Sequence, residues 1–336
     1  MLTPRIIRTA AVVAILLLTL PFLLRPDTPA QEVPATLSVD GVVIPVANLE
    51  RAIDFYSTVL TFERVSQTEV TSEALRARVA RLRLGREVVD LVEYVTPRGR
   101  PIPPDSRSND RWFQHIAIIV NDMDQAYLWL RRHGVERTSP EPQRLPDWNA
   151  SAAGIRAFYF KDPDGHALEI LQFPPDKGAA RWQVPGDTVF LGIDHTAIVV
   201  GDTDSSLRFY RDLLGLKVVG RSENYGPEQE RLNAVTGARI RITTLRASSG
   251  PGIELLEYLA PRDGRSLPAD ARLNDLVAWR TMLTVSSATT LVPRFADAGA
   301  ILVPPGGLAV PRLAAGPRDE VVIRDPDGHA VHLRSR

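Results

Sequence analysis

The chain contains no cysteine, so neither disulfides nor a cysteine-based zinc motif contributes to its fold. It also has no excess of charge of one sign, because 40 lysine and arginine residues balance 40 aspartate and glutamate residues. Without a net charge or a long charge run, no overall field attracts a polyanion, and we expect no nucleic-acid partner. Stability must come from packing, and 336 residues suffice for two cores.

Three familiar signatures of catalysis and cofactor binding are missing as well. The sequence has no P-loop, no Rossmann glycine fingerprint and no nucleophile elbow. Any chemistry must therefore come from other residue patterns.

One uncharged apolar run stands out, at the N-terminus. Ala10–Leu24 follows Arg5 and Arg8 and precedes a proline-containing linker at 26–36. A positive flank before about 15 apolar residues is typical of a secretory signal, although an uncleaved membrane anchor fits too. Both alternatives predict an exported or periplasmic protein, with residues 1–36 as signal or anchor plus linker.

The rest of the chain is an internal repeat. Lys161–Ala167 reads KDPDGHA, and Arg324–Ala330 reads RDPDGHA, 163 residues later. Asp90–Tyr94 (DLVEY) returns as Glu254–Tyr258 (ELLEY) after 164 residues. Near-constant offsets of this kind predict two domains of similar plan.

Each half divides further into two segments with the order strand, helix and three strands. In the first segment the helix is expected at Leu49–Leu60, where apolar residues recur on one face. Asp-Pro-Asp-Gly between two β-rich runs predicts a turn, because proline fixes φ and glycine supplies a positive φ. The predicted domains are 37–174 (modules 37–97 and 112–174) and 189–334 (modules 189–261 and 276–334).

Four βαβββ modules in tandem resemble the vicinal oxygen chelate superfamily, which includes glyoxalase I, bleomycin-binding proteins and extradiol dioxygenases. The resemblance covers residues 37–334 and rests on Phe55-Tyr56, on Phe209–Leu216 (FYRDLLGL) and on both Asp-Pro-Asp-Gly-His turns. It implies an α+β fold in which modules pair into two cup-shaped curved sheets. It does not imply one function, because the superfamily includes several reactions and some non-enzymatic binders.

The resemblance also implies a metal inside a cup, held by residues from the first and last strands of the paired modules. The second and third segments offer two histidines and two glutamates at these positions: His115, Glu169, His195 and Glu254. Such a set suits a divalent metal, namely Zn, Fe, Mn, Ni or Co. Both glutamates lie between apolar neighbours in strands, where carboxylates are rarely buried unless paired or bound to a metal.

The first and fourth segments offer a poorer set at the corresponding positions: Gly41, Asp90, Arg280 and His332. Glycine has no side chain to donate, and an arginine repels a cation. Pairing of sequence neighbours would leave both cups incomplete, whereas pairing of segment two with three, and one with four, unites the intact set. We favour the second arrangement, which requires His115 and His195 to be close in space.

Other polar residues receive structural interpretations. His166 and His329 follow the turns and are expected to be solvated. Glu93 and Glu257 have the opposite strand parity to the candidate ligands, so they should face away from the cups.

The linkers and the large aromatic residues have two possible roles each. The arginines of the two linkers are expected to be solvated connectors, or else to hold an anionic substrate: Arg98, Arg100, Arg107, Arg262, Arg265 and Arg272. Four aromatic residues are expected to pack in the core, or else to line a pocket: Trp112, Trp148, Tyr159 and Tyr225.

The leading hypothesis is an exported metal-dependent lyase or isomerase that acts on a small molecule with two neighbouring oxygens. The metal would be the Lewis acid, and Glu169 or Glu254 the proton-transfer base. Four protein ligands leave few open positions, which favours this chemistry over an extradiol dioxygenase. The alternative is a metal-free protein that sequesters a small molecule. In each case we expect a monomer or homodimer, with membrane contact only through the N-terminal segment.

Overall fold

The computed structural model describes residues 36–183, 186–303 and 319–336. The predicted signal or anchor lies outside the described residues, except for Thr36. Within the described ranges, no helix is long and apolar enough to cross a membrane.

The predicted order of strand, helix and further strands appears in the first three modules, and 3-10 turns take the place of the helix in the fourth. Module one comprises β1 (Thr36–Pro45), α1 (Leu49–Asp54), the π-helical turn η1 (Phe55–Val59), β2 (Glu63–Thr71), β3 (Arg76–Leu84) and β4 (Glu87–Thr96). Module two comprises β5 (Gln114–Val120), α2 (Met123–Arg132), β6 (Glu136–Arg137), β7 (Gln143–Arg144), β8 (Arg156–Lys161) and β9 (Ala167–Gln172). The 3-10 turn η2 (Ala180–Trp182) lies between the halves of the chain.

The second half repeats this plan with two differences. Module three comprises β10 (Phe190–Val200), α3 (Thr203–Leu207), the π-helical turn η3 (Arg208–Leu213), β11 (Lys217–Tyr225), α4 (Pro227–Asn233), β12 (Arg239–Arg246) and β13 (Gly252–Ala260). Module four comprises β14 (Arg280–Val285), the 3-10 turns η4 (Thr289–Arg294) and η5 (Ala296–Ala298), β15 (Ile301–Leu302), β16 (Glu320–Arg324) and β17 (Ala330–Ser335). Helix α4 is an addition, and 3-10 turns replace the helix of module four. The expected α+β fold is confirmed.

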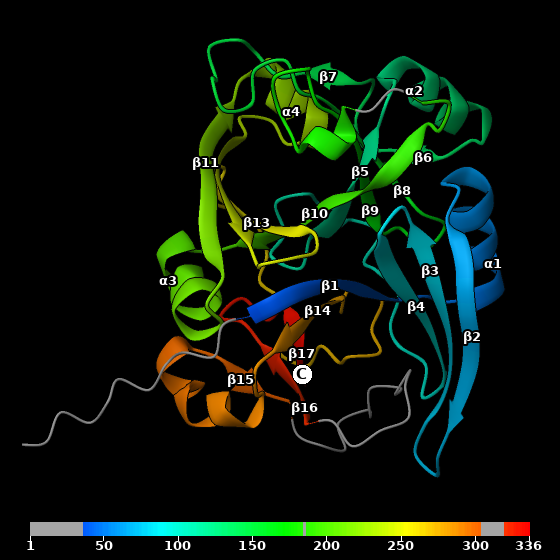
Figure 1. The fold of residues 1–336 in the computed structure, drawn as a ribbon, viewed down its shortest axis with the longest axis vertical. Helices are drawn as coiled ribbons and strands as arrows, with labels where there is room; N and C mark the ends of the chain where they lie inside the picture. The colour runs from blue at the N-terminus through cyan, green and yellow to red at the C-terminus, as the bar shows by residue number, and fades with distance from the viewer. Residues whose placement is uncertain (1–35, 184–185, 304–318) are drawn as a thin grey trace, which may run out of the picture. The chain divides into compact units, whose positions relative to one another are not determined.

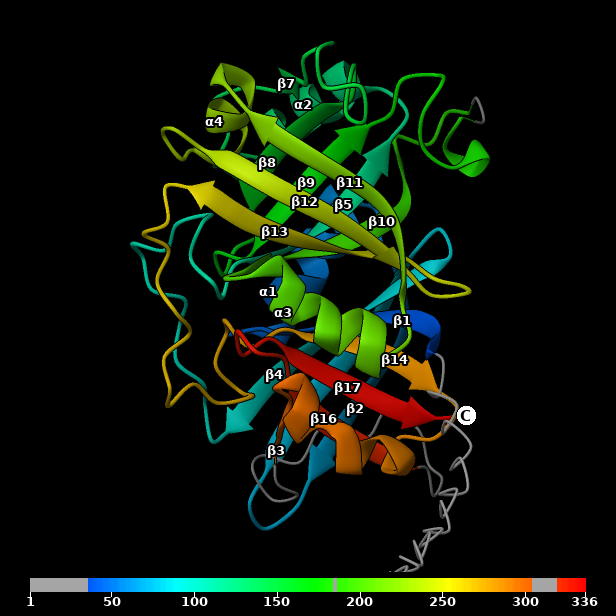
Figure 2. The ribbon, with the colours of Figure 1, turned by 90° about the vertical axis from the view of Figure 1, so that its left-hand side faces the viewer.

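Strand pairing joins module one with module four, and module two with module three. Sheet A has eight strands in the order β15-β16-β17-β14-β1-β4-β3-β2, and sheet B has nine, with the order β11-β12-β13-β10-β5-β9-β8-β6 and β7 beside β8. Both sheets are visible in Figures 1 and 2. The junction between modules is an antiparallel strand pair, β1 with β14 and β5 with β10. The arrangement favoured from the sequence is therefore confirmed, and each half contributes one module to each sheet.

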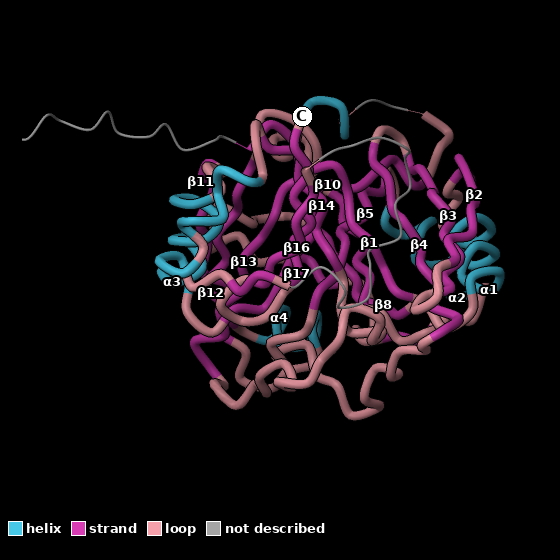
Figure 3. Tube along the Cα trace, turned by 90° about the horizontal axis from the view of Figure 1, so that it is seen from below, coloured by secondary structure: helices cyan, strands magenta, loops and turns pink. Residues whose placement is uncertain are grey.

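The hydrophobic cores join the modules in the other combination. One core draws mainly on modules one and two, including Leu49 and Tyr56 of the first and Met123 and Phe158 of the second. A second core draws mainly on modules three and four. Figure 3 shows α1 and α2 on one side of the strands and α3 on the other. Because sheets and cores connect different pairs of modules, each module is held by two neighbours.

The two histidines that follow the turns are buried, so the prediction that they are solvated is wrong. His166 Nε2 lies 3.0 Å from the carbonyl oxygen of Leu276, and His329 Nε2 lies 2.8 Å from that of Val199. The exposed fractions are 1% for His166 and 8% for His329. Each imidazole thus links its turn to a distant backbone segment.

The turns also explain the Phe-Tyr pairs of the repeat. The Tyr56 hydroxyl lies 3.4 Å from Oδ2 of Asp162, and the Tyr210 hydroxyl donates to Oδ2 of Asp325 at 3.0 Å. In each case the tyrosine and the aspartate belong to neighbouring modules of one half. The motif therefore ties module one to two, and module three to four.

The two linkers cross and bind each other. Arg265 donates to Asp110 at 3.0 and 2.6 Å, and Arg100 makes the corresponding bonds to Asp275 at 3.1 and 2.6 Å. At the crossing, a Cβ on Gly99 would lie 1.7 Å from the carbonyl oxygen of Asn274, so only glycine fits. The linkers are connectors, and at the crossing Asp110 and Asp275 are buried rather than solvated.

We expect Asp110→Ala to destabilise the protein by about 2–4 kcal/mol, because it leaves Arg265 without its buried partner. Asp105 binds the same arginine at 2.8 Å, but its side chain is 73% exposed. Asp105→Ala is therefore the matched control, with a cost below about 1 kcal/mol. Denaturant unfolding measures both values, and equal costs for the two variants would contradict a buried clamp.

Candidate metal centre

The register between β5 and β10 places the two candidate histidines side by side. Ala117 is opposite His195, and Ala197 is opposite His115. The histidines are therefore diagonal neighbours on one face of sheet B, within reach of each other's side chains. Their ring centroids are 5.9 Å apart.

The two glutamates come from the strands that flank this pair. Glu169 on β9 is opposite Ala117, and Glu254 on β13 is opposite Ala197. Residues directly opposite each other share a face of the sheet, so both carboxylates lie on the histidine face. The structure thus brings all four predicted residues together.

The donor atoms of these residues are close enough to bind one ion. His115 Nε2 lies 3.1 Å from Oε2 of Glu169, and His195 Nε2 lies 3.8 Å from the same oxygen. The ligand atoms of these three buried residues are all within 4.8 Å of one another, the one such trio among the described residues. Glu254 stands beside the trio, with Oε2 3.4 Å from His195 Nε2 and a side chain that is 19% exposed.

A fifth residue, Asp194, supports His195 from behind. Its Oδ2 lies 3.1 Å from His195 Nδ1, which leaves Nε2 directed at the two glutamates. Asp194 also accepts hydrogen bonds from Arg246 at 2.9 Å and from Trp182 at 3.1 Å. A carboxylate on the far nitrogen is the usual support for a metal-binding histidine. Sequence reasoning missed this role of Asp194, although the residue directly precedes His195.

The electrostatics of the metal-free site favour a positive charge. Burial by itself disfavours protonation of His195, but the carboxylates of Glu254, Asp194 and Glu169 outweigh it and raise its pKa to about 9. Burial likewise works against ionisation of Asp194, yet His195 and Arg246 hold its pKa well below the usual range. At neutral pH, then, His195 is an imidazolium among carboxylates.

Two further side chains shape the centre. Thr244 donates a hydrogen bond to Oε1 of Glu254 at 2.8 Å, which fixes that carboxylate. The ring of Tyr159 lies 4.9 Å from that of His115. Burial, helped by the charge of Glu169, raises the pKa of Tyr159 far above its usual value, so the phenol stays neutral.

The centre forms part of the wall of a cavity of about 730 Å³. The cavity is bounded by strands of modules two and three and by the loop between β7 and β8. Much of the wall is apolar: Leu145, Ile155, Leu171, Phe173, Ile242 and Leu256. Another part of the wall is polar and includes Arg221, Asn224, Gln229 and Arg246 beside the four candidate ligands. A cavity with apolar walls and convergent polar groups suits a small organic ligand.

Two of the aromatic residues expected in the core are exposed instead. Trp148 is 52% exposed and Tyr225 is 45% exposed, and their ring centroids are 4.3 Å apart. Nearby, Asn149 donates a hydrogen bond to Asn224 at 2.7 Å. These contacts attach the loop between β7 and β8 to β11, a strand that lines the cavity.

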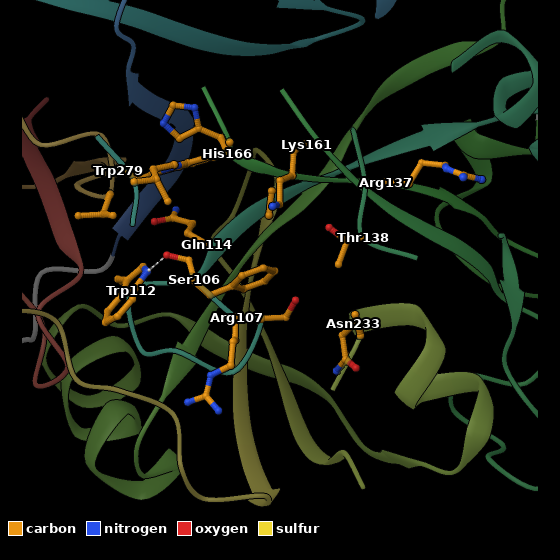
Figure 4. A pocket seen from close by; sticks show the side chains of 17 residues that line it. Ser106, Arg107, Trp112, Gln114, Arg137, Thr138, Lys161, His166, Asn233 and Trp279 are labelled. Atoms are coloured by element: carbon orange, nitrogen blue, oxygen red, sulfur yellow. Dashed lines mark hydrogen bonds between the residues drawn. The ribbon is translucent and has the colours of Figure 1, made fainter. Parts of the chain in front are cut away.

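A smaller cavity of about 280 Å³ lies next to the turn at His166 (Figure 4). Trp112 and Trp279 line it, and Trp112 donates a hydrogen bond to Ser106 at 3.2 Å. His166 is bonded at both ring nitrogens, to Asp162 at 2.8 Å and to the backbone. It is therefore unsuited to metal binding.

The carboxylates that were expected to face away do so. Glu93 accepts a hydrogen bond from the backbone N–H of Leu49 at 3.3 Å, and Glu257 accepts one from that of Thr203 at 3.2 Å. Leu49 and Thr203 begin α1 and α3, so both carboxylates stabilise helix N-termini behind the sheets.

The corresponding positions of sheet A do not form a metal site. Nε and Nη2 of Arg81 donate hydrogen bonds to the two carboxylate oxygens of Asp90, at 2.7 and 2.8 Å. Gly41 has no donor, and Arg280 adds a fixed positive charge. This agrees with the expectation that modules one and four lack a ligand set.

Known proteins resemble this chain in sequence and in fold. A 2-epi-5-epi-valiolone epimerase from an Actinomyces species is 31% identical over 156 residues, 42% of this chain and 82% of that protein. Catechol-2,3-dioxygenase from Bacillus subtilis (strain 168) is 23% identical over 210 residues, 53% of this chain and 64% of that protein. Glyoxalase I from Zea mays shares the fold, with a TM-score of 0.59 and 16% identity over 89% of this chain and 92% of its own.

The family relationship covers most of the chain. The family model described as Glyoxalase/Bleomycin resistance protein/Dioxygenase superfamily matches residues 38–170 and 192–333. These two stretches follow the internal repeat, and together they contain all four modules. The chain therefore belongs to the glyoxalase/bleomycin resistance protein/dioxygenase superfamily.

Proposed function

We propose that this protein is a divalent-metal-dependent isomerase or lyase that acts on a small molecule with two neighbouring oxygens. The observation that carries the proposal is the trio of His115, Glu169 and His195, with ligand atoms within 4.8 Å of one another on a cavity wall. The similarity to an epimerase supports this class of reaction.

The residues fit a divalent ion. Two imidazoles and a carboxylate are the donors that Zn, Fe, Mn, Ni and Co accept in proteins. Asp194 is hydrogen-bonded to Nδ1 of His195, so Nε2 is the nitrogen left to coordinate an ion, on the side of the glutamates. When bound, the ion supplies Lewis-acid polarisation of two substrate oxygens and stabilises the negative charge that develops on them.

Glu254 is our candidate for the proton-transfer base. It stands outside the three-donor trio, and its side chain is partly exposed, whereas Glu169 is buried between the histidines. Thr244 occupies Oε1, which leaves Oε2 available to take a proton from a substrate carbon.

A second candidate is an extradiol-type dioxygenase. Two histidines and one carboxylate are the set that non-haem Fe(II) oxygenases use, and a catechol-2,3-dioxygenase is among the similar proteins. Against it stands Glu254, a second carboxylate 3.4 Å from His195, because two histidines with two carboxylates exceed the set of one carboxylate that these oxygenases use.

Export of the protein stays a prediction from its N-terminal sequence.

The first test is metal content. We expect protein purified from metal-supplemented cells to hold about one divalent ion per chain, and His195→Ala to lose it, because the trio then has two members. His332→Ala, at the equivalent position of Glu169 in sheet A, is the matched control and should retain the ion. Elemental analysis of the folded wild type and both variants measures the metal content per chain. Metal-free wild-type protein would favour the sequestering alternative over an enzyme.

Metal affinity should depend on pH. Binding displaces the proton of His195, whose pKa is about 9, so affinity should rise roughly tenfold per pH unit up to about pH 9 and then level off. Asp194→Asn should move the plateau to lower pH, and should weaken binding there by about 10–100-fold. Chelator competition between pH 6 and 10 measures both, and a flat profile below pH 9 would argue against His195 as a ligand.

The reaction class can be tested by hydrogen exchange. Metal-loaded protein in D₂O should introduce deuterium next to the carbonyl of 2-hydroxyketone probes, as observed by NMR. Glu254→Gln should slow this about 10²–10⁴-fold without loss of metal, whereas Glu257→Gln, on the opposite face of β13, should not. Oxygen uptake with catechol, in the absence of exchange, would establish the dioxygenase instead.

A further inference from the structure

Buried polar atoms without partners are concentrated on one face of sheet A. This face, here named the Arg280 face, contains Tyr94, Arg280, His332 and Arg334, and it corresponds to the metal-binding face of sheet B. Of the twelve side-chain atoms that are buried without a hydrogen bond in the described residues, five belong to these four residues. Such atoms are destabilising, so a group of them in one place requires an explanation.

Strand register shows that these residues share the face. Val43 is opposite both Asp90 and Arg280, and Met282, two residues after Arg280, is opposite His332. Tyr94 is four residues beyond Asp90 on the same strand, so it points the same way. Its ring centroid is 5.9 Å from the Arg280 guanidinium carbon.

Arg280 is the central feature of this face. It is fully buried, and among the described residues its one hydrogen bond runs from Nη1 to the carbonyl oxygen of Leu273 at 3.0 Å. Nε and Nη2 have no hydrogen-bond partner in this part of the chain, and these two atoms form one edge of the guanidinium. Through that edge, an arginine donates two parallel hydrogen bonds to two oxygens of a carboxylate or phosphate.

The neighbouring charges do not neutralise Arg280. Both oxygens of Asp90 are bound by Arg81, and Glu320 lies 3.3 Å from His332 and 3.8 Å from Arg334. A further arginine, Arg324, donates only to backbone carbonyl oxygens, at 2.7 and 3.0 Å. A third carboxylate, Asp40, lies near Arg81 and accepts hydrogen bonds from Ser38 and Thr284. Among the described residues none of these carboxylates contacts Arg280, so its buried positive charge is left without an ion-pair partner.

We propose that the Arg280 face binds a small oxyanion, either a carboxylate or a phosphate. Nε and Nη2 of Arg280 bind two of its oxygens, and the hydroxyl of Tyr94, a buried donor without a partner, binds one of them as well. Sheet B gathers acidic residues and histidines that would suit a cation, whereas sheet A presents the fixed positive charge of Arg280, which suits an anion. This inference is independent of the proposed metal chemistry.

The test is a titration of EDTA-treated full-length protein with sodium acetate and, separately, with inorganic phosphate, at ionic strength held constant with sodium chloride. We expect saturable calorimetric binding of one of the two anions, which identifies the oxyanion. Arg280→Met should abolish it. Arg280→Lys should weaken anion binding at least about tenfold, because an ammonium cannot donate two parallel hydrogen bonds to one anion. Tyr94→Phe should weaken it about three- to tenfold.

His115→Ala is the matched control, because it alters the sheet B centre and should leave anion binding unchanged. Arg280→Met removes an unpaired buried charge, so it is expected to be folded and at least as stable as the anion-free wild type. If it does not fold, Arg280→Lys and Tyr94→Phe carry the test. The proposal is overturned if neither anion saturates, if Arg280→Lys and Tyr94→Phe both bind like wild type, or if binding is lost in His115→Ala and kept in Arg280→Met.

Discussion

The antiparallel register between β5 and β10 is the constraint on which the candidate centre depends. It sets His115 and His195 on one face, next to the two strands that carry the glutamates. Because side chains alternate along a strand, a slip of one residue would turn one histidine to the opposite face. No loop contributes a ligand to the trio, so the rigidity of the sheet is also the rigidity of the centre.

Several independent kinds of contact protect this register. Strands unite modules two and three, whereas the cores and the Asp-Pro-Asp-Gly-His turns unite one with two and three with four. The crossed linkers add reciprocal ion pairs between the halves, from Arg100 to Asp275 and from Arg265 to Asp110. A shift in one interface would strain the others, which explains how a buried cluster of charged side chains is kept in place.

The sequence predicted the features that depend on local pattern. Repeat offsets located the modules, and strand parity assigned Glu169 and Glu254 to one face and Glu257 to the other. What it missed depends on distant contacts. His166 contacts the carbonyl oxygen of Leu276, a residue 110 positions further along the chain. The role of Asp194 depends on a hydrogen bond from Arg246, which lies on another strand of sheet B. No periodicity within a single strand reports such partners.

The order of pairing has a consequence for synthesis of the chain. Sheet B is built from two consecutive modules and can close when residue 260 has been made. In sheet A, β1 must wait for β14, whose first residue lies 235 positions after the end of β1. A ribosome therefore completes the part with the candidate ligands while the first module still exposes an unpaired strand edge, a known route to aggregation. Module four completes sheet A, because its strand β14 pairs with β1. A chain truncated before module four keeps the candidate ligands but leaves the edge of β1 unpaired.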